Sequence, residues 1–176
     1  IVKAALVAVR RLKDYLEHGM AYDISLAYYA ENLDALDDLR REIEQAIWNE
    51  QVADNASARL QEVRRDIQNC EDKMREKAEQ IMRSNKECMS DSFSTIRNGR
   101  VCIPVKKEYK FKIPGIVIDK SATGNTLFIE PVASAKYYEE LQQLRIEEED
   151  EVRRILYTLT GLVELKKSDK GVEMKF

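Results

Sequence analysis

The positions of proline divide this chain into two kinds of sequence. All three prolines (Pro104, Pro114 and Pro131) and three of the six glycines lie between residues 99 and 131. Proline removes a backbone donor and clashes with the preceding helical turn, so a segment that contains it rarely continues a helix. The proline-free stretches on either side can form long helices. The sequence therefore predicts a mainly α fold with a small antiparallel β-rich tip inserted between helices.

Residues 1–54 are predicted to form core helices. Apolar residues from 1 to 18 recur at three- and four-residue steps, which places them on one helix face, and Gly19 provides a natural end. A second amphipathic helix starts somewhere between Tyr22 and Asn32. Its apolar positions are Leu33, Leu36, Leu39, Ile43 and Ile47.

Residues 55–90 and 132–165 are predicted to be two long coiled-coil helices that act as a lever. The first repeats apolar residues every seven positions, at Leu60, Ile67, Met74, Ile81 and Cys88. The second carries a similar pattern, and because only a β segment separates the two, we expect them to pack antiparallel. Aligned outward from the insert, Lys77 falls opposite Glu148. The candidate N-caps of the first helix are Asp54, Asn55 and Ser57.

Residues 91–131 have the signals of a β-rich tip. Asn98-Gly99 favours a type I′ hairpin turn, because both residues tolerate positive φ. Alternating apolar residues predict strands over 93–97 and 100–107, and further apolar runs predict strands over 115–118 and 126–129. Pro104 within a strand indicates an edge position or a bulge.

Recognisable catalytic motifs are missing from the sequence. It has no GxxxxGK[ST] loop, HExxH, GxSxG or paired Cys/His cluster, so no catalytic, cofactor-binding or metal-binding residue is predicted. The three cysteines have no CxxC spacing and are typical of reduced thiols in a cytosolic protein. No apolar run approaches the roughly 18 residues that span a bilayer, so we expect a cytoplasmic protein without a membrane partner.

The tip carries a local excess of positive charge. Residues 92–131 hold seven Lys or Arg and three acids, a net charge of +4 in a chain whose total is −3, so the remainder carries −7. A basic surface with aromatic platforms is typical of proteins that bind the nucleic-acid backbone. The candidate nucleic-acid-binding residues are Arg97, Arg100, Lys106, Lys107, Tyr109, Lys110, Lys112 and Lys120.

Two alternatives remain open for this segment. As a strand, residues 106–112 would place Lys107, Tyr109 and Phe111 on one face and the other lysines opposite. Tyr109 and Phe111 then either stack on bases or close the small core of the tip, and the latter is favoured. The lysines either contact phosphates or protect an edge strand from aggregation.

Several blocks of the chain resemble a signature of the MutS family, in its second bacterial branch, whose members carry a C-terminal Smr nuclease domain. The resemblance spans roughly residues 1–163. Asp54-Asn55-Ala56-Ser57 resembles the entry into the lever helix of that branch. The blocks in the tip are Arg97-Asn98-Gly99-Arg100, Ile103-Pro104-Val105-Lys106, Ile113-Pro114-Gly115-Ile116-Val117 and the run from Ser121 to Pro131.

This resemblance implies a core, lever and clamp region from a dimeric ATPase that embraces branched DNA or collided ribosomes. ATP and Mg²⁺ would belong to an ATPase domain outside this chain, and endonuclease activity to the Smr domain. Ile118 and Lys120 depart from the more polar residues of the family, and residues 166–176, predicted to be an irregular tail, do not follow its pattern. The alternative function is a purely structural arm for dimerisation, without nucleic-acid contact.

Overall fold

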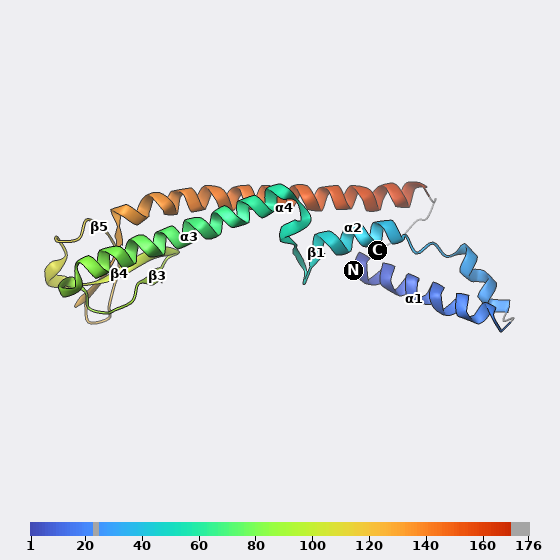
Figure 1. Ribbon diagram of the computed structural model, residues 1–176, viewed down its shortest axis with the longest axis horizontal. Coiled ribbons are helices and arrows are strands. Elements are labelled where there is room, and N and C mark those ends of the chain that lie inside the picture. Colours follow the sequence, from blue (N-terminus) through green and yellow to red (C-terminus); the bar gives the residue numbers. More distant parts are fainter. Residues whose placement is uncertain (23–24, 170–176) are drawn as a thin grey trace. The chain divides into compact units, whose positions relative to one another are not determined.

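The computed structural model describes residues 1–22 and 25–169, so most of the predicted tail, residues 170–176, lies outside the described residues. The chain is mainly helical, with a small antiparallel β part between helices (Figure 1). Its contacts define two compact units. Of the described residues, the first unit comprises 1–22, 25–61 and 151–169, and the second comprises 62–150.

The first unit begins with helix α1 (Val2–Met20), the 3-10 helix η1 (Ser25–Asn32) and helix α2 (Asp37–Ala46). The second predicted helix, whose start was expected between Tyr22 and Asn32, therefore begins later, at Asp37. Leu36 adopts φ 46°, which interrupts a helical path, and its N–H bonds to Asp34 Oδ1 at 2.8 Å. Leu6 of α1 and Leu39 and Ile43 of α2 form one buried apolar cluster.

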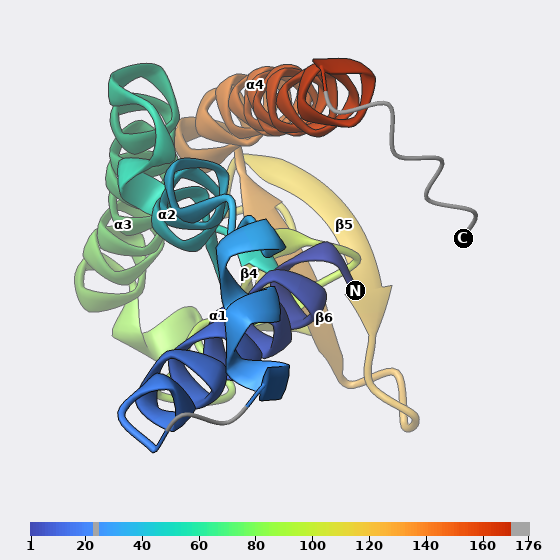
Figure 2. The ribbon, with the colours of Figure 1, turned by 90° about the vertical axis from the view of Figure 1, so that its right-hand side faces the viewer.

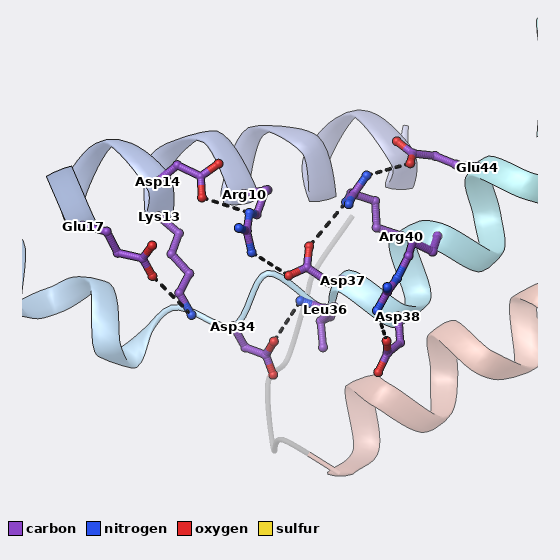
Figure 3. Close-up of polar contacts among 11 residues, drawn as sticks. Arg10, Lys13, Asp14, Glu17, Asp34, Leu36, Asp37, Asp38, Arg40 and Glu44 are labelled. Atoms are coloured by element: carbon purple, nitrogen blue, oxygen red, sulfur yellow. Dashed lines mark hydrogen bonds and ion pairs between the residues drawn. The ribbon is translucent and has the colours of Figure 1, made fainter.

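Polar contacts also join α1 to α2 (Figure 3). Arg10 bonds to Asp14 at 2.9 Å and to Asp37 at 2.7 Å, while Arg40 reaches both Asp37 and Glu44 (Figure 3). These side chains are partly exposed, so each pair contributes roughly 1 kcal/mol or less to stability. The apolar cluster is therefore the main support for this helix pair.

A short hairpin that the sequence did not predict follows α2. Strands β1 (Ile47–Trp48) and β2 (Gln51–Val52) pair antiparallel. Asn49 and Glu50 between them adopt φ 46° and 63°, the positive values that a type I′ turn requires. The 3-10 helix η2 (Asp54–Ala56) then leads into helix α3 (Ala58–Ser84).

Ser57, one of the three predicted N-cap candidates, is the N-cap of α3. Its Oγ accepts a hydrogen bond from the N–H of Leu60 at 3.0 Å, which satisfies a free donor of the first turn. The same hydroxyl donates to Glu151 Oε1 of helix α4 (Val132–Asp169) at 2.6 Å. Leu60 and Ile155 are buried in one cluster beside this contact.

Within the second unit, α3 and α4 pack antiparallel, but in a different register from the predicted one. Glu148 pairs with Arg64 at 2.7 Å, and Arg145 pairs with Glu71 at 2.7 Å. The expectation that Lys77 lies opposite Glu148 is therefore wrong. Helix α4 also continues to Asp169, beyond its predicted end at residue 165.

The register differs because the end of α3 packs against the sheet. After Met74 the buried positions of α3 are Ala78 and Met82, at four-residue steps, whereas the heptad pattern predicted Ile81. Ala78 and Met82 share their apolar cluster with Ile103 and Ile129 of the sheet. The sheet thus lies beside the last turns of α3. The predicted register had assumed that the β insert lies beyond the end of that helix.

The sheet has four antiparallel strands in the order β3-β4-β6-β5. Figure 2 shows β5 and β6 side by side. The strands are β3 (Thr95–Arg97), β4 (Arg100–Lys106), β5 (Gly115–Lys120) and β6 (Thr126–Pro131). Asn98 and Gly99 adopt φ 51° and 75°, as the predicted β3–β4 turn requires. Pro104 lies past the last β3–β4 pair, at Thr95 and Cys102, and opposite Phe128 of β6. Its carbonyl accepts a hydrogen bond from the N–H of Ser90, on the side away from β6, so its missing N–H leaves the β4–β6 ladder intact.

Candidate nucleic-acid interface

The chain leaves the sheet after Lys106, the last residue of β4, and residues 107–112 form a compact loop, so the strand predicted over them is wrong. Lys107–Tyr109 form the 3-10 helix η4. The N–H of Lys110 bonds to the carbonyl of Lys107 at 3.3 Å, and that of Lys112 bonds to the carbonyl of Tyr109 at 2.9 Å. These successive turn bonds curl the backbone, so the side chains do not alternate between two faces as they would in a strand. The predicted division of the side chains between two strand faces therefore does not hold. We call residues 106–113 the basic loop.

The basic loop is fixed to the rest of the second unit at several points. The N–H of Lys107 bonds to the carbonyl of Asn125, in the β5–β6 turn, at 3.0 Å. Tyr109 packs against the main apolar cluster, and Ile113 is buried within that cluster. The loop therefore has a defined path, because two of its side chains contribute to the core.

The lysines of the basic loop differ in how they are engaged. Lys106 Nζ donates to the carbonyl of Glu87 at 2.9 Å, and Lys112 Nζ lies 3.8 Å from the Glu87 carboxylate. Lys107 and Lys110 are exposed and form no ion pair with any described residue. An open hollow beside these lysines is lined also by Ser90, Asn125 and Thr126.

The two aromatic residues of the loop have different environments. Tyr109 is half-buried, with Lys112 Nζ and Lys106 Nζ at 5.2 Å and 5.9 Å from its ring centroid. Phe111 is 94% exposed, and its nearest cation is Lys110, at 5.5 Å from the ring centroid. The core role favoured for both residues fits Tyr109 and is wrong for Phe111.

The two arginines flank the β3–β4 turn and face acidic partners. Arg100 Nη1 pairs with Glu130 Oε2 at 2.5 Å, and the Arg100 guanidinium stacks on Tyr138 with 4.0 Å to the ring centroid. Glu130 is 1% exposed, so this ion pair is an internal support of the sheet. Arg97 lies 3.8 Å from Asp119 and covers the Phe128 ring.

Strand pairing places Lys120 at the same end of the sheet as the basic loop. Lys120 lies opposite Leu127, and Thr126, next along β6, lies opposite Lys106. Of the eight predicted residues, the structure thus gathers four lysines and Tyr109 in one loop and adds Lys120 at the same sheet end. The sequence did not identify Ser90 and Asn125 as residues that line the hollow beside the loop. The only sequence features that could have indicated them are their polar side chains and, for Asn125, the turn beside Gly124.

Among the described residues, three buried cysteines lie outside the basic loop. Burial raises the pKa of Cys102 to about 11 and also raises the pKa of Cys70, so both thiols stay protonated and pack as small apolar groups. Over residues 1–22 and 25–169, no group of three or more His, Cys, Asp or Glu could hold a metal ion. In the same part of the chain, every helix is too short or too polar to cross a bilayer.

Comparison with known proteins links the chain to one group of relatives. No family model matches the chain. The chain is 42% identical over 168 residues to endonuclease MutS2 of Geobacillus sp. (strain WCH70), a match that covers 92% of this chain and 21% of the relative. It is 39% identical to endonuclease MutS2 of Clostridium botulinum (strain Eklund 17B / Type B), with 93% and 21% covered.

A third relative extends the likeness to another genus. Endonuclease MutS2 of Symbiobacterium thermophilum is 40% identical over 156 residues, which are 88% of this chain and 20% of the relative. The chain spans about a fifth of the length of the curated relatives it matches. The likeness covers nearly the whole chain, including the tip that carries the basic loop, and the chain therefore belongs to the MutS2 family as a segment of a longer protein.

Proposed function

We propose that this chain is the lever and clamp segment of a MutS2 protein and that it binds structured DNA or ribosomal RNA through the basic loop. The observation that carries the proposal is the gathering of Lys106, Lys107, Lys110 and Lys112 on one anchored loop. Lysine acts as a mobile point charge toward phosphates, and it does not need the fixed fork geometry that arginine offers.

The charge distribution also favours a phosphate partner. Residues 92–131 hold +4 while the rest of the chain holds −7, so the basic residues are concentrated in the segment that contains the loop. A scattered set of lysines would serve solubility equally well. Arg100 is excluded from our proposed contact set, because its guanidinium neutralises the buried Glu130.

The remaining activities belong to the whole protein and are likewise proposals. We place ATP and Mg²⁺ in an ATPase domain outside this chain and infer that the whole protein is a homodimer. This segment would contribute no catalytic group. It would instead carry the basic loop to the substrate and change its position as the ATPase domain cycles. The relatives are named endonucleases, and we assign any such activity to another part of the protein.

A purely structural arm is the competing function. The structural-arm function is supported by the ion pairs of Arg97 and Arg100 with acids. These pairs give two of the candidate nucleic-acid-binding residues a role in the fold. A structural arm needs no exposed cations on its loop, however. Salt dependence separates the two, because release of counterions from phosphates makes binding fall steeply as salt increases.

The test is a triple charge reversal of Lys107, Lys110 and Lys112 to Glu in the full-length protein. About four loop contacts predict a slope of about −4 for log affinity against log salt on duplex DNA. The triple variant should weaken binding to DNA and to ribosomes alike and flatten that slope by roughly three units. A matched control reverses Arg65, Lys73 and Arg83, which are exposed positions of α3, and should leave binding nearly unchanged. If the loop variant binds like the wild type, the structural arm is the better account.

A further inference from the structure

We propose that Phe111 is a stacking platform for an unpaired nucleobase, so that the basic loop prefers nucleic acid with unpaired bases over continuous duplex. This inference rests on the proposed function and names its substrate class. Among the described residues, Phe111 is the most exposed aromatic side chain, at 94%. A single exposed apolar side chain is common on protein surfaces, so the inference depends on how the ring of Phe111 is held and on what surrounds it.

The ring is held in place by the residues on either side of it. Tyr109, two residues before, packs on the main apolar cluster, and Ile113, two residues after, is 4% exposed in the same cluster. The bond from Lys112 N–H to the Tyr109 carbonyl closes the turn that contains Phe111. Because its neighbours are anchored inward, Phe111 projects outward from a fixed backbone, and little backbone entropy is lost when a ligand covers it.

The surroundings of the ring match the chemistry of a nucleotide. Lys110 lies 5.5 Å from the ring centroid, and Lys107 and Lys110 have no ion-pair partner among the residues that the structure describes. These cations can contact the phosphates that flank a base stacked on the ring. Phe111 also lines the open hollow, where Ser90, Asn125 and Thr126 offer hydroxyl and amide groups for the sugar or the base edge. One acid, Glu108, lines the same hollow beside three lysines, so the cations outnumber it.

An unpaired base fits this site better than a paired one. Within a continuous duplex both faces of each base are already stacked, so a side chain that inserts there must first unstack a base step, a cost that an end, a gap, a bulge or a junction avoids. Every base has an aromatic face, so stacking tolerates different sequences. Tyr109 cannot serve in the same way, because its packing against the core occupies part of its ring.

The experiment compares Phe111→Ala, Phe111→Trp and Lys107→Glu/Lys110→Glu with the wild type, all in the full-length protein. Each is titrated with an oligonucleotide of fixed length as single strand, as duplex with a five-nucleotide gap and as continuous duplex, in DNA and RNA forms. Phe111→Ala should weaken binding to the single strand and the gapped duplex on the order of tenfold and leave the continuous duplex unchanged. Phe111→Trp should restore binding, and 2-aminopurine in the gap should be quenched by the wild type and not by Phe111→Ala.

The outcomes separate this inference from the proposed function. If Phe111→Ala weakens all three forms equally or none, while the lysine variant weakens all of them, stacking is wrong and phosphate binding stands. If neither variant changes any affinity, both proposals fail. The DNA and RNA arms identify the strand that supplies the base. Binding to phosphatidylserine vesicles that depends on Phe111, with nucleic-acid binding unaffected, would overturn the inference in favour of a membrane contact.

Discussion

At the scale of single residues, the ion pair between Arg100 and Glu130 shows how the tip uses charge internally. Glu130 is 1% exposed, and its Oε1 has no hydrogen-bond partner among the described atoms, so Arg100 is the cation that compensates it. A buried carboxylate that loses its partner is costly, because water cannot replace the guanidinium. The basic character of residue 100 in the sequence therefore reflects folding.

This environment predicts different effects for the two arginines of the sheet. Arg100→Ala should lower the free energy of unfolding by about 3 kcal/mol, since it leaves Glu130 buried and unpaired. Arg97→Ala is the matched control, because its ion pair with Asp119 is exposed, and it should cost less than about 1 kcal/mol. Urea denaturation followed by circular dichroism measures both. Equal costs would contradict the internal role of Arg100.

Two glycines provide a second test of packing. A Cβ on Gly115 would overlap the backbone oxygen of Glu130, so Gly115→Ala must shift one strand against another. We expect a loss of roughly 1–3 kcal/mol in the free energy of unfolding. A Cβ on Gly161 of α4 would meet open space, so Gly161→Ala should stabilise by up to about 1 kcal/mol. Thermal melts of both variants should move in opposite directions.

At the scale of secondary-structure elements, the start of α3 is linked to α4 by a buried acid. Glu151 accepts hydrogen bonds from Arg154 and from Ser57, and these bonds lower its pKa to about 2. A carboxylate whose folded-state pKa is depressed stabilises the fold above its unfolded pKa, and this contribution is lost as the pH falls. The link is therefore intact at neutral pH and weakens in acid.

Glu151→Gln should reveal this pH dependence. At pH 7 the variant should unfold at lower urea than the wild type, because the charge-assisted bonds are weakened. The difference between the two proteins should shrink as the pH is lowered from about 4.5 toward about 2, where Glu151 itself becomes protonated. A constant difference over this range, measured by urea midpoints, would show that the carboxylate is not the stabilising group.

Adjacent residues of α4 test which helix face is buried. Ile155 is 7% exposed and packs with Leu60, whereas Leu156 is 43% exposed. Ile155→Ala should lower the free energy of unfolding by about 2–4 kcal/mol, as a large-to-small change in a core does. Leu156→Ala should cost less than about 1 kcal/mol, because less of its side chain leaves water on folding. Chemical denaturation compares the two, and the reverse order would contradict this packing of α3 against α4.

At the scale of the whole molecule, the sequence predicted what local patterns determine. Proline placement, heptad spacing and Asn98-Gly99 specified two long helices around a β-rich insert and the β3–β4 hairpin. It could not specify the helix register or the path of residues 106–112. Both depend on how the sheet packs against Met74, Ala78 and Met82, which is a long-range contact without a periodic signal. The loop lysines were identified by charge, while the engagement of Arg100 with Glu130 required the fold.

The junction between the sheet and its helices has a mechanical consequence. Strand β6 ends at Pro131 and α4 begins at Val132, whose N–H bonds to the carbonyl of Pro114, so no linker separates them. On the other side, the last turns of α3 are part of the sheet's own core. A rotation of this portion of either helix is therefore transmitted directly to the sheet. The lysines and Phe111 of the basic loop rotate together with it.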